Sequence, residues 1–140
     1  MNINKIENVD DFYAITRSAE LVVITTYRGD WCPYCIDQFN TIAALLPQIE
    51  DKGVQVVGIS PDLITAVRNT QRRFSQQFIF LSDPQANVIS RFGIARDNNM
   101  PHPAVYLVDK GGKLLWFYAS TDHKKRPNGE QLLAVIEANL

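Results

Sequence analysis

The chain has 140 residues, of which 46% are apolar and 21% charged. At this length roughly two-thirds of the extended chain's surface is buried on folding, which suffices for one stable core and predicts a single domain over residues 1–140. The formal net charge of −1 leaves no basic excess, so nucleic acid is not expected as a partner.

The N-terminal segment carries no apolar stretch of signal-peptide length and turns acidic at Glu7, so we expect a cytoplasmic protein. A helix is expected around residues 10–18 and a strand over residues 21–27. This strand is β-branched and continuously apolar at its start, which is typical of a central strand covered on both faces. It is also the longest nearly apolar run, far short of the roughly 20 residues of a membrane helix, so no membrane association is expected.

A helical pattern begins at Pro33, after which apolar residues recur at three- and four-residue steps. Proline suits the first turn of a helix because an N–H would be unpaired there. Pro47 is expected to kink or end this helix. A second buried strand is predicted over residues 54–59, and a further helix is predicted to open at residues 60–62 with an inward face that includes Leu63.

The second half of the chain continues with a short strand over residues 78–81 and a helix around residues 88–92. Strands over residues 104–108 and 114–118 are joined by a tight turn and form an antiparallel hairpin. The last helix is expected to start near Asn128, with Gln131 as its capping-box partner and an apolar face formed by Leu132, Leu133, Ile136 and Leu140. This order of elements predicts an α/β fold with a central mixed sheet flanked by helices on both faces.

Cys32 and Cys35 are the only two cysteines, and they lie three positions apart where the first strand gives way to a helix. A secreted disulfide scaffold would carry more cysteines. A zinc site needs about four ligands, and the remaining soft candidates are only His102 and His123, so metal coordination and accidental spacing are the minor alternatives. The pattern favours a redox dithiol that requires no metal and no other cofactor.

The spacing of the two cysteines has a chemical consequence. A sulfur at the N-terminus of a helix is stabilised as a thiolate by unpaired N–H groups and the helix dipole. A second sulfur nearly one turn further can attack a mixed disulfide on the first and release the reduced product. We expect Cys32 to attack, because the first sulfur of such a helix is usually the exposed one, and we expect Trp31 to cover one side of the pair.

Residues 27–35 resemble the active-site segment of the thioredoxin superfamily, Trp-Cys-x-x-Cys after a central strand, and the Pro33-Tyr34 insert is similar to that of glutaredoxins. The remainder resembles the alkyl hydroperoxide reductase/thiol-specific antioxidant (AhpC/TSA, peroxiredoxin-like) branch, in the segments 57–62, 81–84, 92–94 and 106–113. The resemblance spans roughly residues 20–137 and implies a thioredoxin-like fold.

The chain departs from the peroxiredoxin pattern at the residues that activate peroxide. Peroxiredoxins carry a Pro, a Thr and a distant Arg around their peroxidatic cysteine. Aligned by the preceding Tyr, that cysteine falls on Cys35, the Thr on Cys32, the Pro on Arg28 and the distant Arg on Pro103. Thioredoxin-like oxidoreductases keep a cis-proline facing the dithiol at this last place, which the resemblance implies for Pro103.

A second departure concerns the proton of the second thiol. Thioredoxins bury an acidic residue six positions before the first cysteine, and Thr26 stands there instead. His102 would serve as a base if its turn faces the cysteines, the alternative being an exposed loop histidine. Arg28 either lowers the pKa of a nearby thiol or pairs with Asp30. The basic run 123–126 is expected to be a solvated loop, with an anion or acidic-partner contact as the alternative.

These features support the hypothesis of a thiol–disulfide oxidoreductase, in which Cys32 attacks a substrate disulfide and Cys35 resolves the intermediate. The alternative is a peroxiredoxin-like thiol peroxidase, in which hydroperoxide oxidises one cysteine and the other closes the disulfide. A redox sensor or zinc-holding module is the third hypothesis. Expected partners are a protein or small-molecule disulfide, or a hydroperoxide, with a cellular thiol or dithiol as reductant. Residues expected to bind substrate are Arg28, Trp31, Pro33, Tyr34, His102 and Pro103.

Overall fold

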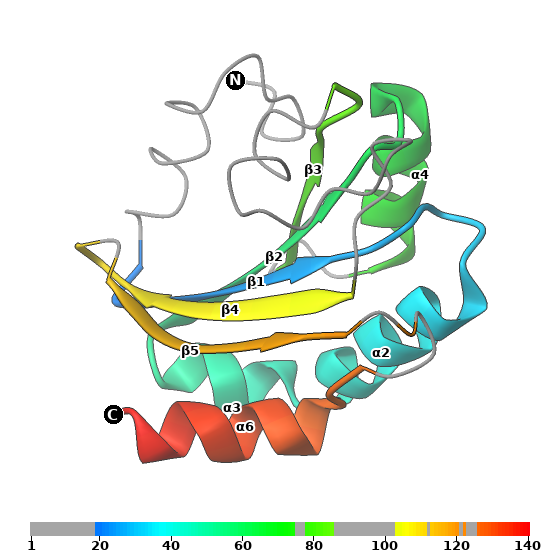
Figure 1. Cartoon of the computed structure of the whole chain (residues 1–140). Helices are drawn as coiled ribbons and strands as arrows, with labels where there is room; N and C mark the ends of the chain where they lie inside the picture. Colours follow the sequence, from blue (N-terminus) through cyan, green and yellow to red (C-terminus); the bar gives the residue numbers. More distant parts are fainter. Residues whose placement is uncertain (1–18, 75–77, 86–102, 112, 121, 123–125) are drawn as a thin grey trace.

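The computed structural model describes residues 19–74, 78–85, 103–111, 113–120, 122 and 126–140. Within these ranges five strands form one twisted sheet, with helices packed beneath it and beside it (Figure 1). Along the chain the elements are β1 (Leu21–Thr26), α2 (Pro33–Ala44), α3 (Leu46–Asp51), β2 (Val54–Ser60), α4 (Ile64–Arg73), β3 (Phe78–Ser82), β4 (Ala104–Asp109), β5 (Leu114–Ala119) and α6 (Gly129–Ala138).

The sheet is mixed, as predicted. Its strand order is β3-β2-β1-β4-β5, with β1 in the centre. Strands β1, β2 and β3 run parallel to one another, whereas β4 is antiparallel to both β1 and β5. All six residues of β1 are buried, as the continuously apolar start of this strand predicted.

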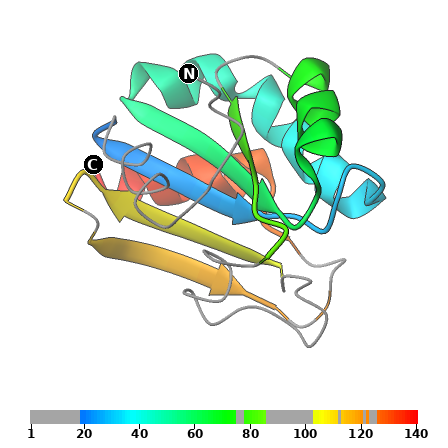
Figure 2. The same cartoon turned by 90° about the horizontal axis from the view of Figure 1, so that it is seen from above.

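The main apolar core lies between the sheet and the described helices (Figure 2). Its centre is Phe39 of α2, whose ring meets Tyr27, Phe74, Phe78 and Phe80 edge-on, at centroid distances of 5.0 to 6.0 Å. Edge-to-face pairs of this kind add stability beyond the area they bury. Helices α2, α3, α4 and α6 each contribute buried side chains to this core, so all four cover the same face of the sheet.

The opposite face of the sheet carries a second apolar cluster, formed by Val22, Ile24, Val57, Ile59, Leu81, Ala104 and Tyr106. The helices expected around residues 10–18 and 88–92 lie outside the described residues. The predicted α/β class is confirmed, and the first face shows the predicted helical layer.

Local sequence signals account for most helix ends. Pro47 lies in the first turn of α3 and separates it from α2, as expected from its missing N–H. Asn128 and Gln131 form the predicted capping box of α6: Gln131 N–H donates to Asn128 Oδ1 at 2.9 Å, and Asn128 N–H donates to Gln131 Oε1 at 2.8 Å. The predicted inward positions of Leu63 and Leu140 are wrong, because both side chains are 67% exposed.

Candidate active site

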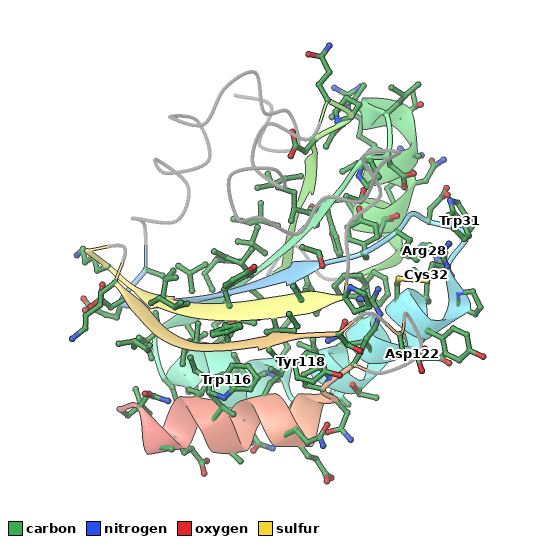
Figure 3. The ribbon with its side chains drawn as sticks, in the orientation of Figure 1. Arg28, Trp31, Cys32, Trp116, Tyr118 and Asp122 are labelled. Atoms are coloured by element: carbon green, nitrogen blue, oxygen red, sulfur yellow. A yellow bond between two sulfur atoms is a disulfide. The ribbon has the colours of Figure 1, made fainter. Side chains whose placement is uncertain are left out.

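Cys32 and Cys35 form a disulfide at the N-terminus of α2 (Figure 3), with their Cα atoms 5.3 Å apart. Cys32 is the N-cap residue, in an extended conformation, and Pro33 occupies the first helical turn as predicted. The Cys35 N–H points at Cys32 Sγ, 3.4 Å away. The helix therefore presents an unpaired amide to the first sulfur, as the thiolate argument requires.

Both cysteines are buried in this oxidised state. Cys32 is 1% exposed and Cys35 is not exposed at all, so the expectation that Cys32 is the exposed partner is wrong for the disulfide form. Cys35 Sγ accepts a second backbone donor, the N–H of Arg28, at 3.4 Å. Each sulfur thus has one amide within hydrogen-bond reach, and burial does not distinguish the attacking sulfur.

The predicted substrate-binding side chains before and after Cys32 are exposed. Trp31 is 56% exposed and Tyr34 is 40% exposed, and Pro33 is exposed between them. The Arg28 guanidinium lies 4.9 Å from the centre of the Trp31 ring, within cation–π range. Arg28 therefore stacks on Trp31, and no ion pair joins it to Asp30, although both residues are described.

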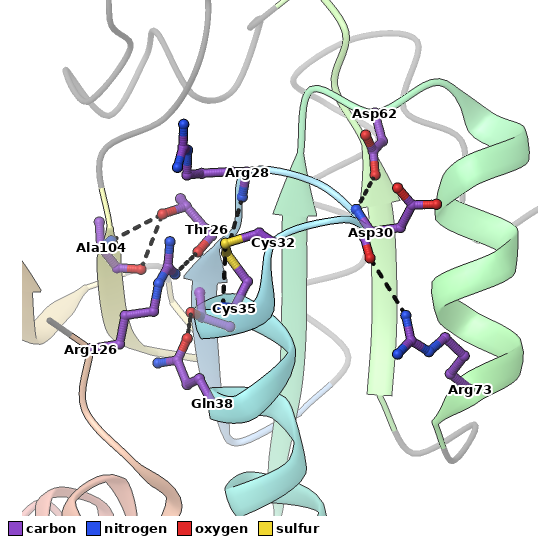
Figure 4. Close-up of a disulfide and its surroundings, with 11 residues drawn as sticks. Thr26, Arg28, Asp30, Cys32, Cys35, Gln38, Asp62, Arg73, Ala104 and Arg126 are labelled. Carbon is purple, nitrogen blue, oxygen red and sulfur yellow. Dashed lines mark hydrogen bonds between the residues drawn. A yellow bond between two sulfur atoms is a disulfide. The ribbon is translucent and has the colours of Figure 1, made fainter. Parts of the chain in front are cut away.

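Ala104, the residue that follows Pro103, lies beside the end of β1 that leads to the disulfide (Figure 4). Thr26, the last residue of β1, accepts the N–H of Ala104 on its Oγ1 at 3.0 Å, and the same hydroxyl donates to the Ala104 carbonyl at 3.4 Å. These bonds fix the residue after Pro103 beside the strand end that leads to the cysteines. Pro103 itself is buried. His102 and the peptide bond joining it to Pro103 lie outside the described residues, so the expected base and cis bond stay predictions.

Arg126 is the site residue that the sequence analysis missed. Its Nη1 donates to the carbonyl of Thr26 at 2.6 Å (Figure 4), so this end of the basic run is not a solvated loop. Burial and, to a smaller extent, the positive charge of Arg28 lower the pKa of Arg126 to about 10, while Tyr118 opposes this shift. The remaining members of the run, residues 123–125, lie outside the described ranges.

Gln38 connects α2 to the segment that carries Arg126. Its Nε2 donates to the Pro127 carbonyl at 2.9 Å, and its Oε1 accepts the Thr25 hydroxyl at 3.2 Å, both in buried surroundings. A pocket of about 180 Å³ opens beside this contact, lined by Tyr34, Asp37, Gln38, Thr41, Arg126, Pro127 and Asn128. The pocket adjoins the active-site helix at Tyr34, one of the predicted substrate-binding residues.

Asp62 holds the other side of the active-site loop. Its Oδ2 accepts the Asp30 N–H at 2.9 Å, while Arg73 Nη1 donates to the Asp30 carbonyl at 3.5 Å (Figure 4). Burial raises the pKa of Asp62 above its ordinary value; the hydrogen bond from Asp30 opposes this rise and the negative charge of Asp30 adds to it. In the sequence, Asp62 belongs to one of the family-like segments, 57–62, which gives no sign of this contact.

Within the described ranges there is neither a cluster of metal ligands nor a membrane-spanning helix. No three His, Cys, Asp or Glu side chains gather there as metal ligands would, and both histidines named as candidate ligands lie outside those ranges. None of the helices in the described part of the chain combines the length and apolar character needed to cross a bilayer.

A mixed sheet in this order, with a Cys-x-x-Cys disulfide on the helix after its central strand, defines a thioredoxin-like fold. Solved structures agree. Peroxidoxin BcpB from Mycobacterium tuberculosis has a TM-score of 0.76 and 24% identity, covering 89% of this chain and 83% of that one. Xanthomonas campestris peroxiredoxin Q has a TM-score of 0.75 and 21% identity, and the match covers 89% of this chain and 82% of that one.

The chain belongs to the AhpC/TSA family, whose family model matches residues 7–117. The thiol-disulfide oxidoreductase ResA of Bacillus thuringiensis subsp. konkukian (strain 97-27) is 27% identical over 94 residues, which are 66% of this chain and 51% of that protein. A putative chloroplastic peroxiredoxin Q of Oryza sativa subsp. indica is 26% identical over 113 residues, which are 79% of this chain and 52% of that protein. The chain thus spans about half the length of these curated relatives, and the family expected from the motifs is confirmed.

Proposed function

We propose that this chain is a thiol–disulfide oxidoreductase that cycles Cys32 and Cys35 between dithiol and disulfide. The observation that carries the proposal is the disulfide at the start of α2, with a backbone amide directed at each sulfur. The relative named ResA, a thiol-disulfide oxidoreductase, supports the same reaction class.

The proposed reaction runs in two exchanges. The Cys32 thiolate attacks one sulfur of a substrate disulfide; a mixed disulfide forms and the first substrate thiolate leaves and takes up a proton. The Cys35 thiolate then attacks Cys32 Sγ, which closes the protein disulfide and expels the second substrate thiolate. A cellular thiol or dithiol returns two electrons and restores the reduced pair.

The exposed side chains around the disulfide are proposed to form the substrate-binding surface. Trp31, Pro33 and Tyr34 are exposed neighbours of Cys32 in the sequence and offer apolar and aromatic surface to a disulfide-bearing chain. Arg28, Pro103 and His102 remain the other proposed members. A substrate that binds there has its disulfide next to the N-terminus of α2.

Trapping tests the two cysteine roles. Cys35→Ser removes the resolving sulfur, so intact-mass spectrometry after incubation with a model disulfide should show a stable adduct on Cys32. Cys32→Ser is the matched control and should accumulate far less adduct. Accumulation on Cys32→Ser alone would reverse the roles, and accumulation on neither would contradict the proposed cycle.

A peroxidase is the second candidate function, because the family and the relative named peroxiredoxin Q point to it. Here hydroperoxide would oxidise one thiolate to sulfenic acid, and the other thiol would close the disulfide with loss of water. The absence of the family's Thr and Arg at Cys32 and Pro103 argues for the first candidate. Stopped-flow rates of the reduced protein with hydroperoxide and with a model disulfide, side by side, distinguish the two: oxidation no faster than that of a free thiol would eliminate the peroxidase.

A cytoplasmic location is also part of the proposal. A chain with two cysteines in one reactive pair fits a reducing compartment, where disulfides are transient and catalytic. Fractionation of cells that express the native gene product would test it; recovery with an extracytoplasmic fraction would contradict it.

A further inference from the structure

Arg126 contacts the backbone of the residue that stands where thioredoxins keep a buried acid. Thr26 stands six positions before Cys32, at the place of that acid, and its carbonyl accepts Arg126 Nη1 at 2.6 Å. The residue two positions further along the chain, Arg28, gives its N–H to Cys35 Sγ. The structure therefore brings a cation to the end of the strand on which thioredoxins carry a carboxylate.

The guanidinium is held there by contacts between α2 and the start of α6. Gln38 Nε2 donates to the carbonyl of Pro127, and the Gly129 N–H donates to Thr41 Oγ1 at 2.9 Å. Pro127 and Gly129 are both buried. Because these contacts fix the residues that follow Arg126 to the helix that bears Cys35, the cation and the sulfur belong to one rigid arrangement.

From this geometry we infer that Arg126 is a positioning residue that favours the thiolate of Cys35 once Cys32 is bound in the mixed disulfide. The inference rests on the proposed dithiol cycle and adds to it the origin of the resolving nucleophile. A carboxylate would have to accept the Cys35 proton during the second exchange. A fixed cation instead favours the Cys35 thiolate in the mixed disulfide, and the Cys35 proton goes to solvent.

Arg126 keeps its positive charge at neutral pH. Burial and the charge of Arg28, from the active-site loop, lower its pKa, and Tyr118 of β5 raises it. The lowered pKa of Arg126, about 10, still leaves it cationic at neutral pH. Arg126 binds Thr26 and Cys35 binds Arg28, and the backbone between two residues so placed spans roughly 7 Å when extended. At an effective dielectric constant of about 20, a unit charge at that range shifts a pKa by roughly one to two units.

The second exchange then balances without a base. The Cys35 thiolate donates an electron pair to Cys32 Sγ, the Cys32–Cys35 bond forms, and the bond from Cys32 to the substrate sulfur breaks. The leaving substrate sulfur carries away the pair and takes a proton from solvent. Cys32 and Cys35 are oxidised and the substrate disulfide is reduced by two electrons.

The pKa of Cys35 tests the inference directly. In a Cys32→Ser background, where serine preserves the N-cap, thiolate absorbance at 240 nm is followed against pH. Adding Arg126→Gln should raise the Cys35 pKa by about one unit, because the cation is lost. Arg126→Lys should restore most of that shift. Arg126→Met, which keeps an unbranched apolar stem, serves as a second neutral variant if Gln impairs folding.

Arg68→Gln is the matched control, since Arg68 is an exposed arginine on α4. It should leave the Cys35 pKa unchanged. An unchanged pKa in folded Arg126→Gln and Arg126→Met, or equal effects of Gln and Lys, would overturn the inference. The titration needs no turnover, so a low Cys35 pKa that depends on Arg126 in an inactive protein would contradict only the proposed function.

Discussion

The Asp62 carboxylate makes the free energy of unfolding depend on pH. It is half-buried, its Oδ2 binds the Asp30 N–H, and burial raises its pKa above the ordinary 3.8. The folded protein therefore holds this proton to higher pH than the unfolded chain does. The protonated form of Asp62 stabilises the fold fully below pH 3.8. This stabilisation is lost as the pH rises through the pKa of Asp62 in the folded protein.

Asp62→Asn should therefore have a pH-dependent effect. Asparagine retains an oxygen for the Asp30 N–H but does not titrate. The difference in free energy of unfolding, Asp62→Asn minus wild type, should increase as the pH rises above 3.8 and then level off. Urea unfolding at a series of pH values measures it, with Asp51→Asn, an exposed carboxylate at the end of α3, as control. A difference that falls with pH would contradict the prediction.

At the scale of elements, local patterns predicted the strands well and one helix start poorly. The buried runs in β1 and β2 and the capping box of α6 are short-range signals, and the structure confirms each. The helix expected to open at residues 60–62 starts later, because Ser60 still pairs with Ser82 in the sheet and Leu63 becomes the exposed N-cap of α4. The start of α4 therefore depends on the pairing of strands that are distant in the sequence. The spacing of apolar residues along the chain does not reveal that pairing.

The close contact of α6 with α2 at Gly129 leads to a testable prediction. A Cβ at Gly129 would overlap the carbonyl of Thr41 and stand 3.0 Å from Ile42 N, both backbone atoms that cannot swing aside. Alanine's better helix propensity offers at most about 1 kcal/mol, whereas overpacking costs about 1–3 kcal/mol. Gly129→Ala should therefore lower the free energy of unfolding, by about 1–2 kcal/mol in urea titrations. Glu130→Ala, at the exposed next position, should have little effect; equal losses would refute the steric explanation.

At the scale of the whole molecule, the carboxyl end of β1 is where the site is assembled. The cysteine pair and its role in a strand–helix junction were predictable, because they follow one another in the sequence. The contact between Arg126 and Thr26 joins residues 100 positions apart, and the run 123–126 gives no local sign of it. Two of its four residues are lysines, the usual composition of a solvated loop, so only the tertiary arrangement reveals the buried guanidinium.

The redox potential should report this long-range contact. If Arg126 stabilises the Cys35 thiolate, it stabilises the reduced form of the protein relative to the disulfide. Arg126→Gln should then make the disulfide easier to form, and the potential should become more negative by about 30 mV for each unit of pKa lost. For each unit by which the Cys35 pKa rises, the oxidised form should be stabilised relative to the reduced form by about 1.4 kcal/mol.

Equilibration in thiol–disulfide buffers, followed by alkylation and mass analysis, measures that potential at pH 7. Wild type and Arg68→Gln should share one value, Arg126→Lys should lie close to it, and Arg126→Gln should lie below all three. A less negative potential in Arg126→Gln would mean that the arginine stabilises the disulfide, because neutralising a cation beside a thiolate can only shift the equilibrium toward the uncharged, oxidised pair.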